Sequence, residues 1–316
     1  MSGAVTHESA LGLALRYRAR RVTTPDGVTI AVQDWAHDGA PRKAELLLLH
    51  GFSQSHGAWL HQVTSPLAAE YRLVTYDLRG HGDSDKPTAA HFYREKDRWA
   101  DEVKAVIDQS GLQRPILVAW SYAGRVVLDY LSVFGDSGIS ALVMANAMAK
   151  SDPALMGPAT GLLREMTSAD AAVALEGTKA LLRASVANPL SPDEFDYMLR
   201  YNQSVPPTVR TNLAGRPADY ESVLRSLSVP TLVMQGMLDP ITTSAMGAYT
   251  AQQVPGAELI RYDDLAHMPF WEAPQRFNAD LAQFVRRVSQ QSCGRLAPGR
   301  TTEQPSLTAG PGENIK

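Results

Sequence analysis

The sequence predicts an α/β fold in which a mainly parallel β-sheet carries helices on both faces and a helical segment is inserted between two strands. Between residues 44 and 262, short apolar runs of strand length alternate with segments whose apolar residues recur at helical spacing. This rhythm is interrupted from residue 149 to 228, where no strand-like run occurs and the pattern is helical. Because parallel strands need crossover connections, such alternation predicts helices covering both faces of one sheet.

The composition is typical of a globular protein large enough for one α/β domain and an insertion. The 316 residues are 44% hydrophobic and 20% charged, and the formal net charge is −3. No long Lys/Arg cluster occurs, so we expect no binding to nucleic acid. The single cysteine, Cys293, excludes an intramolecular disulfide, and the apolar run at residues 11–15 is too short for a signal peptide or a membrane span. We therefore expect a cytoplasmic protein, with no membrane partner and with homo-oligomerisation left open.

Eight strands are expected. Two alternating segments flank the turn triplet Pro25-Asp26-Gly27 and indicate an antiparallel hairpin at a sheet edge. The later runs are continuously apolar, as is typical of strands buried on both faces of a parallel sheet. The expected strands are residues 16–24, 29–35, 44–49, 71–76, 115–120, 139–148, 230–236 and 257–262.

Helical spacing predicts helices over residues 98–110, directly after residue 121, and over 274–288. Within the interruption, residues 162–182 and 192–201 are expected to be helical. Eighty residues without structure would be unusual in a compact domain, so we interpret residues 149–228 as a helical cap or lid. The core is then formed by residues 1–148 and 229–290, and the polar segment 291–316 is expected to be a disordered tail.

Ser121 stands where an apolar strand gives way to a helical pattern. A strand that turns into a helix through one residue holds that residue in a strained conformation, and small neighbours such as Ala119, Ala123 and Gly124 are needed. This turn lifts the hydroxyl off the carboxyl end of the sheet, as a nucleophile requires. By itself, a serine with small neighbours is more often an ordinary strand-to-helix connection.

A serine hydroxyl needs a base, and the base needs an orienting carboxylate. His267 follows the last expected strand, and Asp239 follows the strand before it, so both are expected at the carboxyl edge of the sheet. Asp239 could instead cap a helix that begins at Pro240. Asp263 and Asp264 are rivals for the carboxylate, although they are poorly placed to reach the far ring nitrogen of His267.

The oxyanion formed during acyl transfer needs two donors. The backbone N–H groups of Phe52, after the first central strand, and Tyr122, after the serine, are the candidates. His50 and His81 are interpreted as loop-packing residues, and neither His56 nor His61 has neighbours typical of a metal site.

Several segments resemble the α/β-hydrolase family, in particular its epoxide-hydrolase and haloperoxidase-like esterase branch. They are His50-Gly51-Phe52, residues 77–84 (DLRGHGDS), the turn at Ser121, residues 236–240 (GMLDP) and residues 266–269 (AHMP). The resemblance covers about residues 16–290 and implies an α/β-hydrolase fold with a mostly parallel, eight-stranded sheet, in which Asp77 and Arg79 are structural. The order Ser121, Asp239, His267 is that of the family. The glycines usual at positions 119, 123 and 266 are alanines here.

A serine nucleophile indicates acyl chemistry, because epoxide hydrolases of the family attack with an aspartate. The leading hypothesis is hydrolysis of a small-molecule carboxylic ester or lactone through an acyl-enzyme, without a cofactor or metal. A C–C bond hydrolase, amidase, acyltransferase or perhydrolase with the same three residues is left open, as is a non-catalytic ligand receptor. Arg164 and Arg200 in the lid leave an anionic substrate open. The residues expected to line the substrate pocket are Trp59, Met148, Tyr197, Met198 and Phe270.

Overall fold

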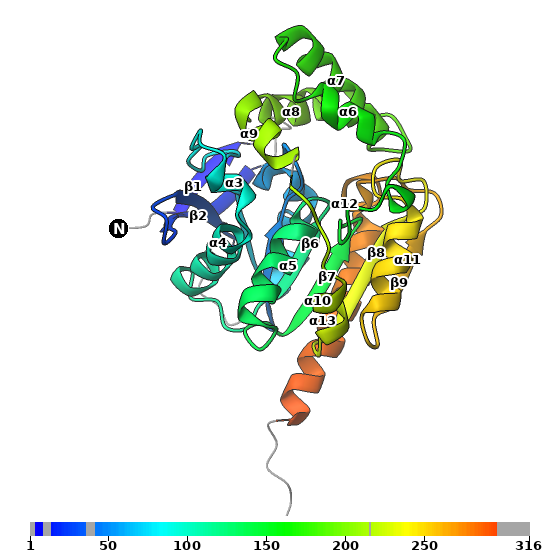
Figure 1. Ribbon diagram of the computed structural model, residues 1–316. Coiled ribbons are helices and arrows are strands. Elements are labelled where there is room, and N and C mark those ends of the chain that lie inside the picture. Colours follow the sequence, from blue (N-terminus) through cyan, green and yellow to red (C-terminus); the bar gives the residue numbers. More distant parts are fainter. Residues whose placement is uncertain (1–3, 9–13, 36–41, 215, 296–316) are drawn as a thin grey trace, which may run out of the picture.

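A computed structural model describes residues 4–8, 14–35, 42–214 and 216–295. Its centre is one twisted sheet with the strand order β1-β2-β3-β5-β4-β6-β7-β8-β9 (Figure 1). Strands β4 to β9 are parallel to one another, whereas β1, β2 and β3 are joined by antiparallel pairing, and β3 pairs antiparallel with β5. The α/β-hydrolase fold expected from the sequence is confirmed.

All eight expected strands are present, and an additional edge strand, β1 (Ala4–Glu8), brings the described sheet to nine. The antiparallel hairpin is formed by β2 (Ala14–Thr23) and β3 (Thr29–Asp34) around the expected turn. The remaining strands are β4 (Glu45–Leu49), β5 (Arg72–Tyr76), β6 (Ile116–Trp120), β7 (Ala141–Ala145), β8 (Thr231–Gly236) and β9 (Glu258–Tyr262).

The two faces of the sheet carry two separate hydrophobic clusters, which explains why the central strands are apolar at every position. Along β4, Leu47 and Leu49 belong to one cluster, whereas Leu46 and Leu48 belong to the other. The first face is covered by α4 (Lys96–Gln109), α5 (Ala123–Phe134), α10 (Glu221–Ser226) and α11 (Ser244–Gln253). The second is covered by α1 (Leu60–Val63), α2 (Leu67–Glu70), α12 (Pro269–Glu272) and α13 (Pro274–Arg295).

Short helices complete the loops at the carboxyl edge. They are the 3₁₀ helices η1 (His56–Trp59) and η2 (Pro153–Leu155) and the helix α3 (His91–Arg94).

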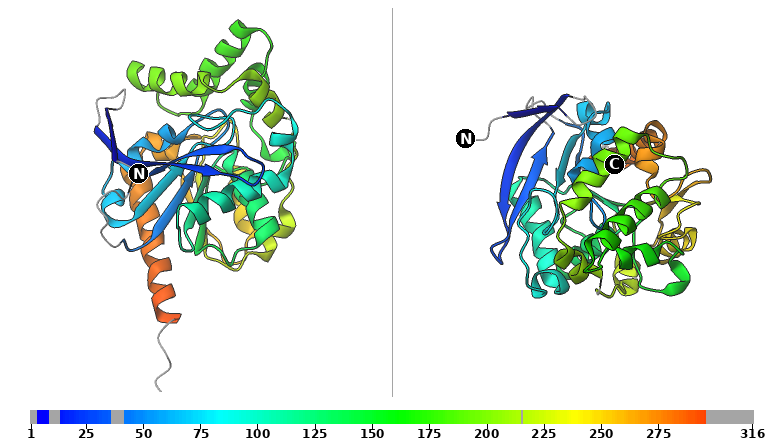
Figure 2. Two further views of the ribbon diagram at one scale, coloured as in Figure 1. Left: turned by 90° about the vertical axis from the view of Figure 1, so that its left-hand side faces the viewer. Right: turned by 90° about the horizontal axis from the view of Figure 1, so that it is seen from above.

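The insertion forms a separate layer above the carboxyl edge of the sheet (Figures 1 and 2). Its helices are α6 (Thr160–Glu165), α7 (Ala171–Ala184), α8 (Pro192–Gln203) and α9 (Pro207–Ala214). The single helix expected over 162–182 is divided, because Asp170 caps α7 by accepting hydrogen bonds from the N–H groups of Ala172 (2.8 Å) and Val173 (3.3 Å). The last insertion helix, α10, leaves this layer and packs against α5 and α11.

Helix α13 continues to Arg295, beyond residue 291 where the disordered tail was expected to begin, so that boundary was placed too early. The rest of the expected tail, residues 296–316, lies outside the described residues. No helix in the described ranges combines the length and apolar character needed to cross a membrane.

Candidate active site

Ser121 forms a sharp turn between β6 and α5. Its φ of 57° lies in the left-handed region, which is costly for a residue other than glycine and is maintained here by close packing. A Cβ atom on Gly51 would lie 2.9 Å from Ser121 Cβ, and one on Gly124 would lie 2.5 Å from the carbonyl oxygen of Met148. Ala119 and Ala123 are fully buried within this turn. The serine is therefore held at the sheet edge by neighbours that have no room for larger side chains.

His267 lies in the loop after β9 and faces the serine. Its Nε2 atom is 2.9 Å from Ser121 Oγ, and its Nδ1 atom is 2.7 Å from Asp239 Oδ2. The backbone of His267 is held on both sides, because its N–H donates to the carbonyl of Ser185 in the insertion (3.0 Å) and its own carbonyl accepts from the Trp120 indole (2.9 Å). The structure thus joins the three predicted residues in one hydrogen-bonded chain.

Asp239 is buried and is held as an acceptor. Its Oδ1 atom accepts hydrogen bonds from the backbone N–H groups of Ile241 (2.7 Å) and Thr242 (3.1 Å), which leaves Oδ2 facing the histidine. The rivals lie elsewhere: Asp264 is exposed and pairs with Arg276 at 2.9 Å, and Asp263 is also exposed. The carboxylate beside His267 is therefore that of Asp239.

Asn146, which the sequence did not single out, supports this carboxylate. It directly follows β7, has a φ of 43° and is fully buried. Its Nδ2 atom donates to Asp239 Oδ2 (2.7 Å) and to the carbonyl of Ala266 (3.1 Å), while its Oδ1 atom accepts from the N–H of Gly236 (3.2 Å). One side chain thus links the ends of three segments that carry the site. The signal in the sequence was a lone amide inside an otherwise apolar run.

The loop of Phe52 is fixed by two buried, neutral histidines. The His81 Nε2 atom accepts a hydrogen bond from the Ser53 N–H (3.1 Å), and the His50 Nε2 atom accepts one from the Leu78 N–H (3.0 Å). Burial lowers the pKa of His50 to about 4 and that of His81 to about 3, so both accept at neutral pH. Within the described residues, the N–H groups of Phe52 and Tyr122 have no acceptor in the protein. Both histidines have the loop-packing role expected from the sequence.

The segment of residues 77–84 is held by buried ion pairs and hydrogen bonds. Despite burial, the pKa of Asp77 lies well below its usual range, because the His56 imidazole pairs with it (Nδ1 to Oδ1 2.9 Å) and the N–H of Asp83 donates to it (3.0 Å). Arg79 is buried between Glu102 (2.6 Å) and Asp26 (2.8 Å). Among the described residues, no cluster of three His, Cys, Asp or Glu side chains is placed to bind a metal.

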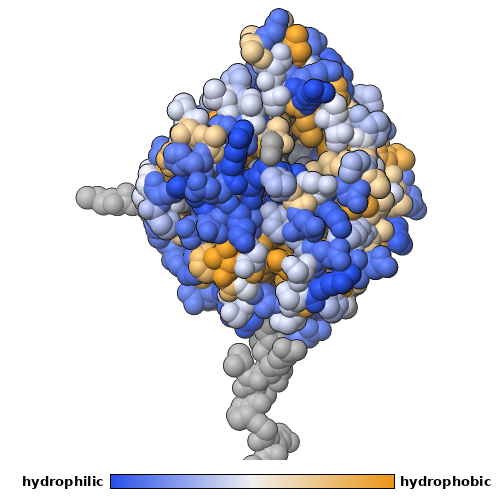
Figure 3. Space-filling view, viewed as in Figure 1, coloured by the Kyte–Doolittle hydropathy of each residue, from blue (hydrophilic) through white to orange (hydrophobic). Residues whose placement is uncertain are grey.

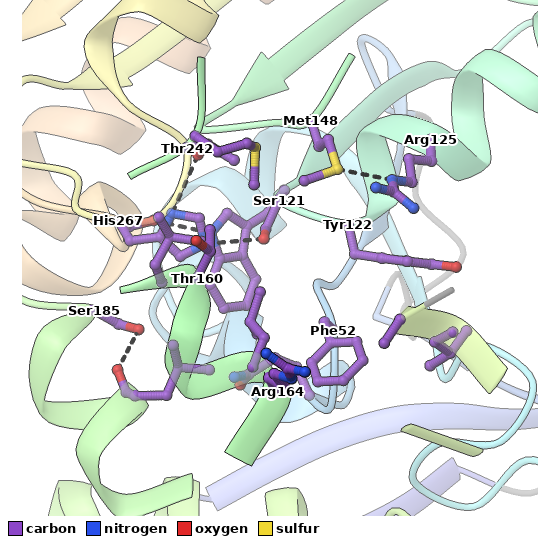
Figure 4. Close-up of a pocket in the computed structure, with 18 of the residues that line it drawn as sticks. Phe52, Ser121, Tyr122, Arg125, Met148, Thr160, Arg164, Ser185, Thr242 and His267 are labelled. Carbon is purple, nitrogen blue, oxygen red and sulfur yellow. Dashed lines mark hydrogen bonds between the residues drawn. The ribbon is translucent and has the colours of Figure 1, made fainter. Parts of the chain in front are cut away.

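A cavity of about 350 Å³ lies between the insertion and the sheet edge, and Ser121 and His267 line it (Figure 4). In the space-filling view, a hollow flanked by hydrophobic residues lies beneath the insertion (Figure 3). The core side of the cavity is formed in part by Phe52, Trp120 and Met148, and the insertion contributes Met156, Leu163 and Leu181. Two cationic side chains, Arg125 and Arg164, also line it.

Of the five residues expected to line the pocket, only Met148 does so. Trp59 and Phe270 are fully buried and pack against each other, with ring centroids 4.6 Å apart. Met198 is fully buried in the same cluster, and Tyr197 stacks on Trp271 and donates to the Gly57 carbonyl. These four residues pack against other protein side chains and do not line the cavity, so the prediction that they form the substrate pocket was wrong.

Comparison with known proteins agrees with the fold. The model of the α/β-hydrolase fold family matches residues 45–274. An esterase of known structure from Rhodococcus sp. ECU1013, RhEst1, is 30% identical, with a TM-score of 0.78 over 85% of this chain and 99% of the esterase. The non-heme chloroperoxidase CPO-A1 of Kitasatospora aureofaciens is 28% identical over 84% of this chain and 98% of its own length.

A third relative, 3-oxoadipate enol-lactonase 1 of Acinetobacter baylyi, is 25% identical over 84% of this chain and 97% of its own length. The match of the family model extends from β4 through the loop that carries His267, so it spans strands β4 to β9, the insertion and the site. The chain therefore belongs to the α/β-hydrolase family, in the branch of the haloperoxidases and esterases, and is an enzyme of that family.

Proposed function

We propose that this enzyme hydrolyses a carboxylic ester or lactone through an acyl-enzyme formed on Ser121. The observation that carries the proposal is the hydrogen-bonded chain from Ser121 through His267 to Asp239 at the wall of a largely apolar cavity. His267 accepts the hydroxyl proton as Ser121 Oγ bonds to the substrate's carbonyl carbon. Asp239 fixes the ring orientation and stabilises the imidazolium that forms.

The negative charge that develops on the carbonyl oxygen requires donors. The N–H groups of Phe52 and Tyr122 are assigned this role, because they flank the serine and have no other acceptor among the described residues. When the tetrahedral adduct collapses, the imidazolium protonates the leaving alkoxide. A water that gives its proton to His267 then attacks the acyl-enzyme, and the acid is released as Ser121 regains its proton.

The insertion acts in this proposal as a lid. Ser185, at the end of α7, accepts the hydrogen bond from the His267 N–H, and Glu272 accepts from the N–H groups of Ala187 (2.6 Å) and Ala266 (2.9 Å). The lid and the histidine loop are therefore anchored to each other. A lid held in this way excludes bulk water from the acyl-enzyme while it confines the acyl group.

Esterase and enol-lactonase relatives support ester or lactone cleavage rather than attack on an amide. The test is hydrolysis of short p-nitrophenyl esters and of a lactone panel by the wild type, Ser121→Ala and Asp239→Asn. We expect multiple turnovers by the wild type and a loss of at least about 10³-fold in both variants. Equal activity of Ser121→Ala and wild type would refute the proposal, and a single stoichiometric turnover would favour a ligand-binding role.

A further inference from the structure

The cavity combines a cationic lining with no acidic group. Arg125 from α5 and Arg164 from α6 both line it, whereas no Asp or Glu side chain does among the described residues. In Figure 4 the Arg164 side chain lies beside Phe52, and the Arg125 guanidinium lies beside Tyr122 and Met148. A small apolar ester has no charged group that could pair with either arginine.

Arg125 is the more informative of the two, because its guanidinium is buried and has no carboxylate partner among the residues that the structure describes. The side chain follows the serine by one helical turn, and the residue is 7% exposed. Its hydrogen bonds go to the thioether of Met148, the carbonyl of Arg216 and the hydroxyl of Ser151 (3.1 Å). Each of these acceptors is uncharged, and a thioether is a weak one.

The nearby carboxylate of Asp129 is already occupied. It pairs with Arg216 and accepts a hydrogen bond from the hydroxyl of Tyr220 (2.7 Å). Two buried arginines therefore share one buried carboxylate, which leaves one net positive charge beside the cavity. The face of Tyr122, 5.4 Å from the Arg125 guanidinium carbon, compensates only part of the desolvation cost of that charge.

Buried charges in proteins are normally paired, because an unpaired one loses its hydration without replacement. Each terminal nitrogen of Arg125 bears two N–H groups and uses one of them in the bonds above, so a second N–H on each remains for a planar, two-oxygen acceptor. We propose that the substrate is an anionic ester, which carries an ionised carboxylate in addition to the ester group, and that this carboxylate pairs with Arg125. Arg164, on the exposed side of the lid, attracts that anion to the cavity.

This proposal rests on the proposed ester hydrolysis and narrows its substrate class. It also differs from a purely structural role for Arg125, in which the side chain only ties Ser151 and Arg216 together at the base of the lid. Loss of a structural contact would lower kcat/KM for neutral and anionic esters alike. Loss of a charge partner changes the ratio between them.

The test uses esters matched in shape. Monomethyl esters of succinic, glutaric and adipic acid are compared with methyl butanoate, pentanoate and hexanoate, in which a methyl group replaces the carboxylate. Acetyl esters of glycolic and 3-hydroxypropanoic acid, compared with ethyl and propyl acetate, place the carboxylate on the alcohol side. We expect kcat/KM of the wild type to favour the anionic member of at least one set by about 10-fold or more.

Arg125→Met should lower this anionic-to-neutral ratio by about 10- to 100-fold. Arg164→Met should lower it by only a few-fold, and that smaller effect should vanish at high salt, because an exposed charge is screened. Arg200→Met is the matched control, since Arg200 is an exposed lid arginine outside the cavity, and its ratio should equal that of the wild type.

The inference is overturned if the wild type shows no anionic preference in either set, a result that does not depend on whether Arg125→Met folds. An Arg125→Met ratio equal to that of the wild type would also overturn it. If no ester is hydrolysed, the proposed function fails, and calorimetry then decides the inference separately: Ser121→Ala should bind monomethyl glutarate at least about 10-fold more tightly than methyl pentanoate. Equal affinities for the two esters would overturn it.

Discussion

Replacement of Asn146 by Asp changes one atom of the side chain and removes one hydrogen bond at Asp239. The amide nitrogen of Asn146 donates to Asp239 Oδ2 across 2.7 Å, and in Asn146→Asp a carboxylate oxygen takes its place. Two like charges at this separation repel by about 6 kcal/mol at an effective dielectric constant of 20, which is an upper bound. The charged hydrogen bond that is lost contributes about 1.5–3 kcal/mol.

From that lost bond we expect kcat/KM for a p-nitrophenyl ester at pH 7 to fall about 10- to 100-fold. The introduced carboxylate also favours the imidazolium of His267, so the acid limb of the kcat/KM–pH profile should move to higher pH. Far-UV circular dichroism and thermal unfolding check that the variant folds. Asn278→Asp is the control: Asn278 also donates to a backbone carbonyl, that of His61 (3.2 Å), but lies on α13.

The pH profile is what separates a positioning role from a structural one, since a merely destabilised protein loses activity without moving its acid limb. A profile for Asn146→Asp that superimposes on that of the wild type, with kcat/KM reduced by less than about three-fold, would show that Asn146 does not position Asp239.

Three further changes have defined outcomes. In Glu272→Gln, either the N–H of Ala187 in the insertion or the N–H of Ala266 beside the histidine loses its acceptor. The free energy of unfolding, measured by urea titration, should therefore fall by about 2 kcal/mol. An unchanged midpoint would contradict the anchoring of the insertion to the histidine loop by Glu272. The free energy of unfolding should fall as the pH drops from 6.5 towards 3, because the depressed pKa of His81 makes the folded state bind fewer protons than the unfolded state. His81→Gln should reduce the slope of unfolding free energy against pH by about 1.4 kcal/mol per pH unit. Parallel curves for the variant and the wild type would contradict this. Ala123→Gly should keep kcat/KM within about three-fold with a slightly lower Tm, and inactivity would show that the methyl group matters.

The sheet and the meeting of the three candidate site residues could be predicted because both depend on local pattern. Strands buried on both faces must be apolar throughout, and the loops that follow parallel strands meet at one edge, which placed Ser121, Asp239 and His267 together. The division of residues 162–182 into two helices depended on a single cap at Asp170, which the apolar spacing did not register.

The cavity wall could not be predicted in the same way. Large apolar residues such as Trp59 and Met198 are equally suited to a core and to a pocket. Whether they are buried in the core or line the cavity depends on the path of the insertion. Arg125 looked like an ordinary position in a helix after the serine, and its significance depends on which acceptors surround it. Asn146 was hidden in an apolar run because its role is to join loops distant in sequence.

The proposed mechanism requires acylation of Ser121 in each turnover. Its most direct test is intact-protein mass spectrometry after brief acid quench of the enzyme with a p-nitrophenyl ester, followed by peptide mapping, with a fluorophosphonate probe as an irreversible counterpart. We predict an acyl adduct on the peptide that contains Ser121, formed at the rate of the p-nitrophenol burst and absent from Ser121→Ala. Turnover with no adduct at Ser121, or an adduct that persists in Ser121→Ala, would contradict it.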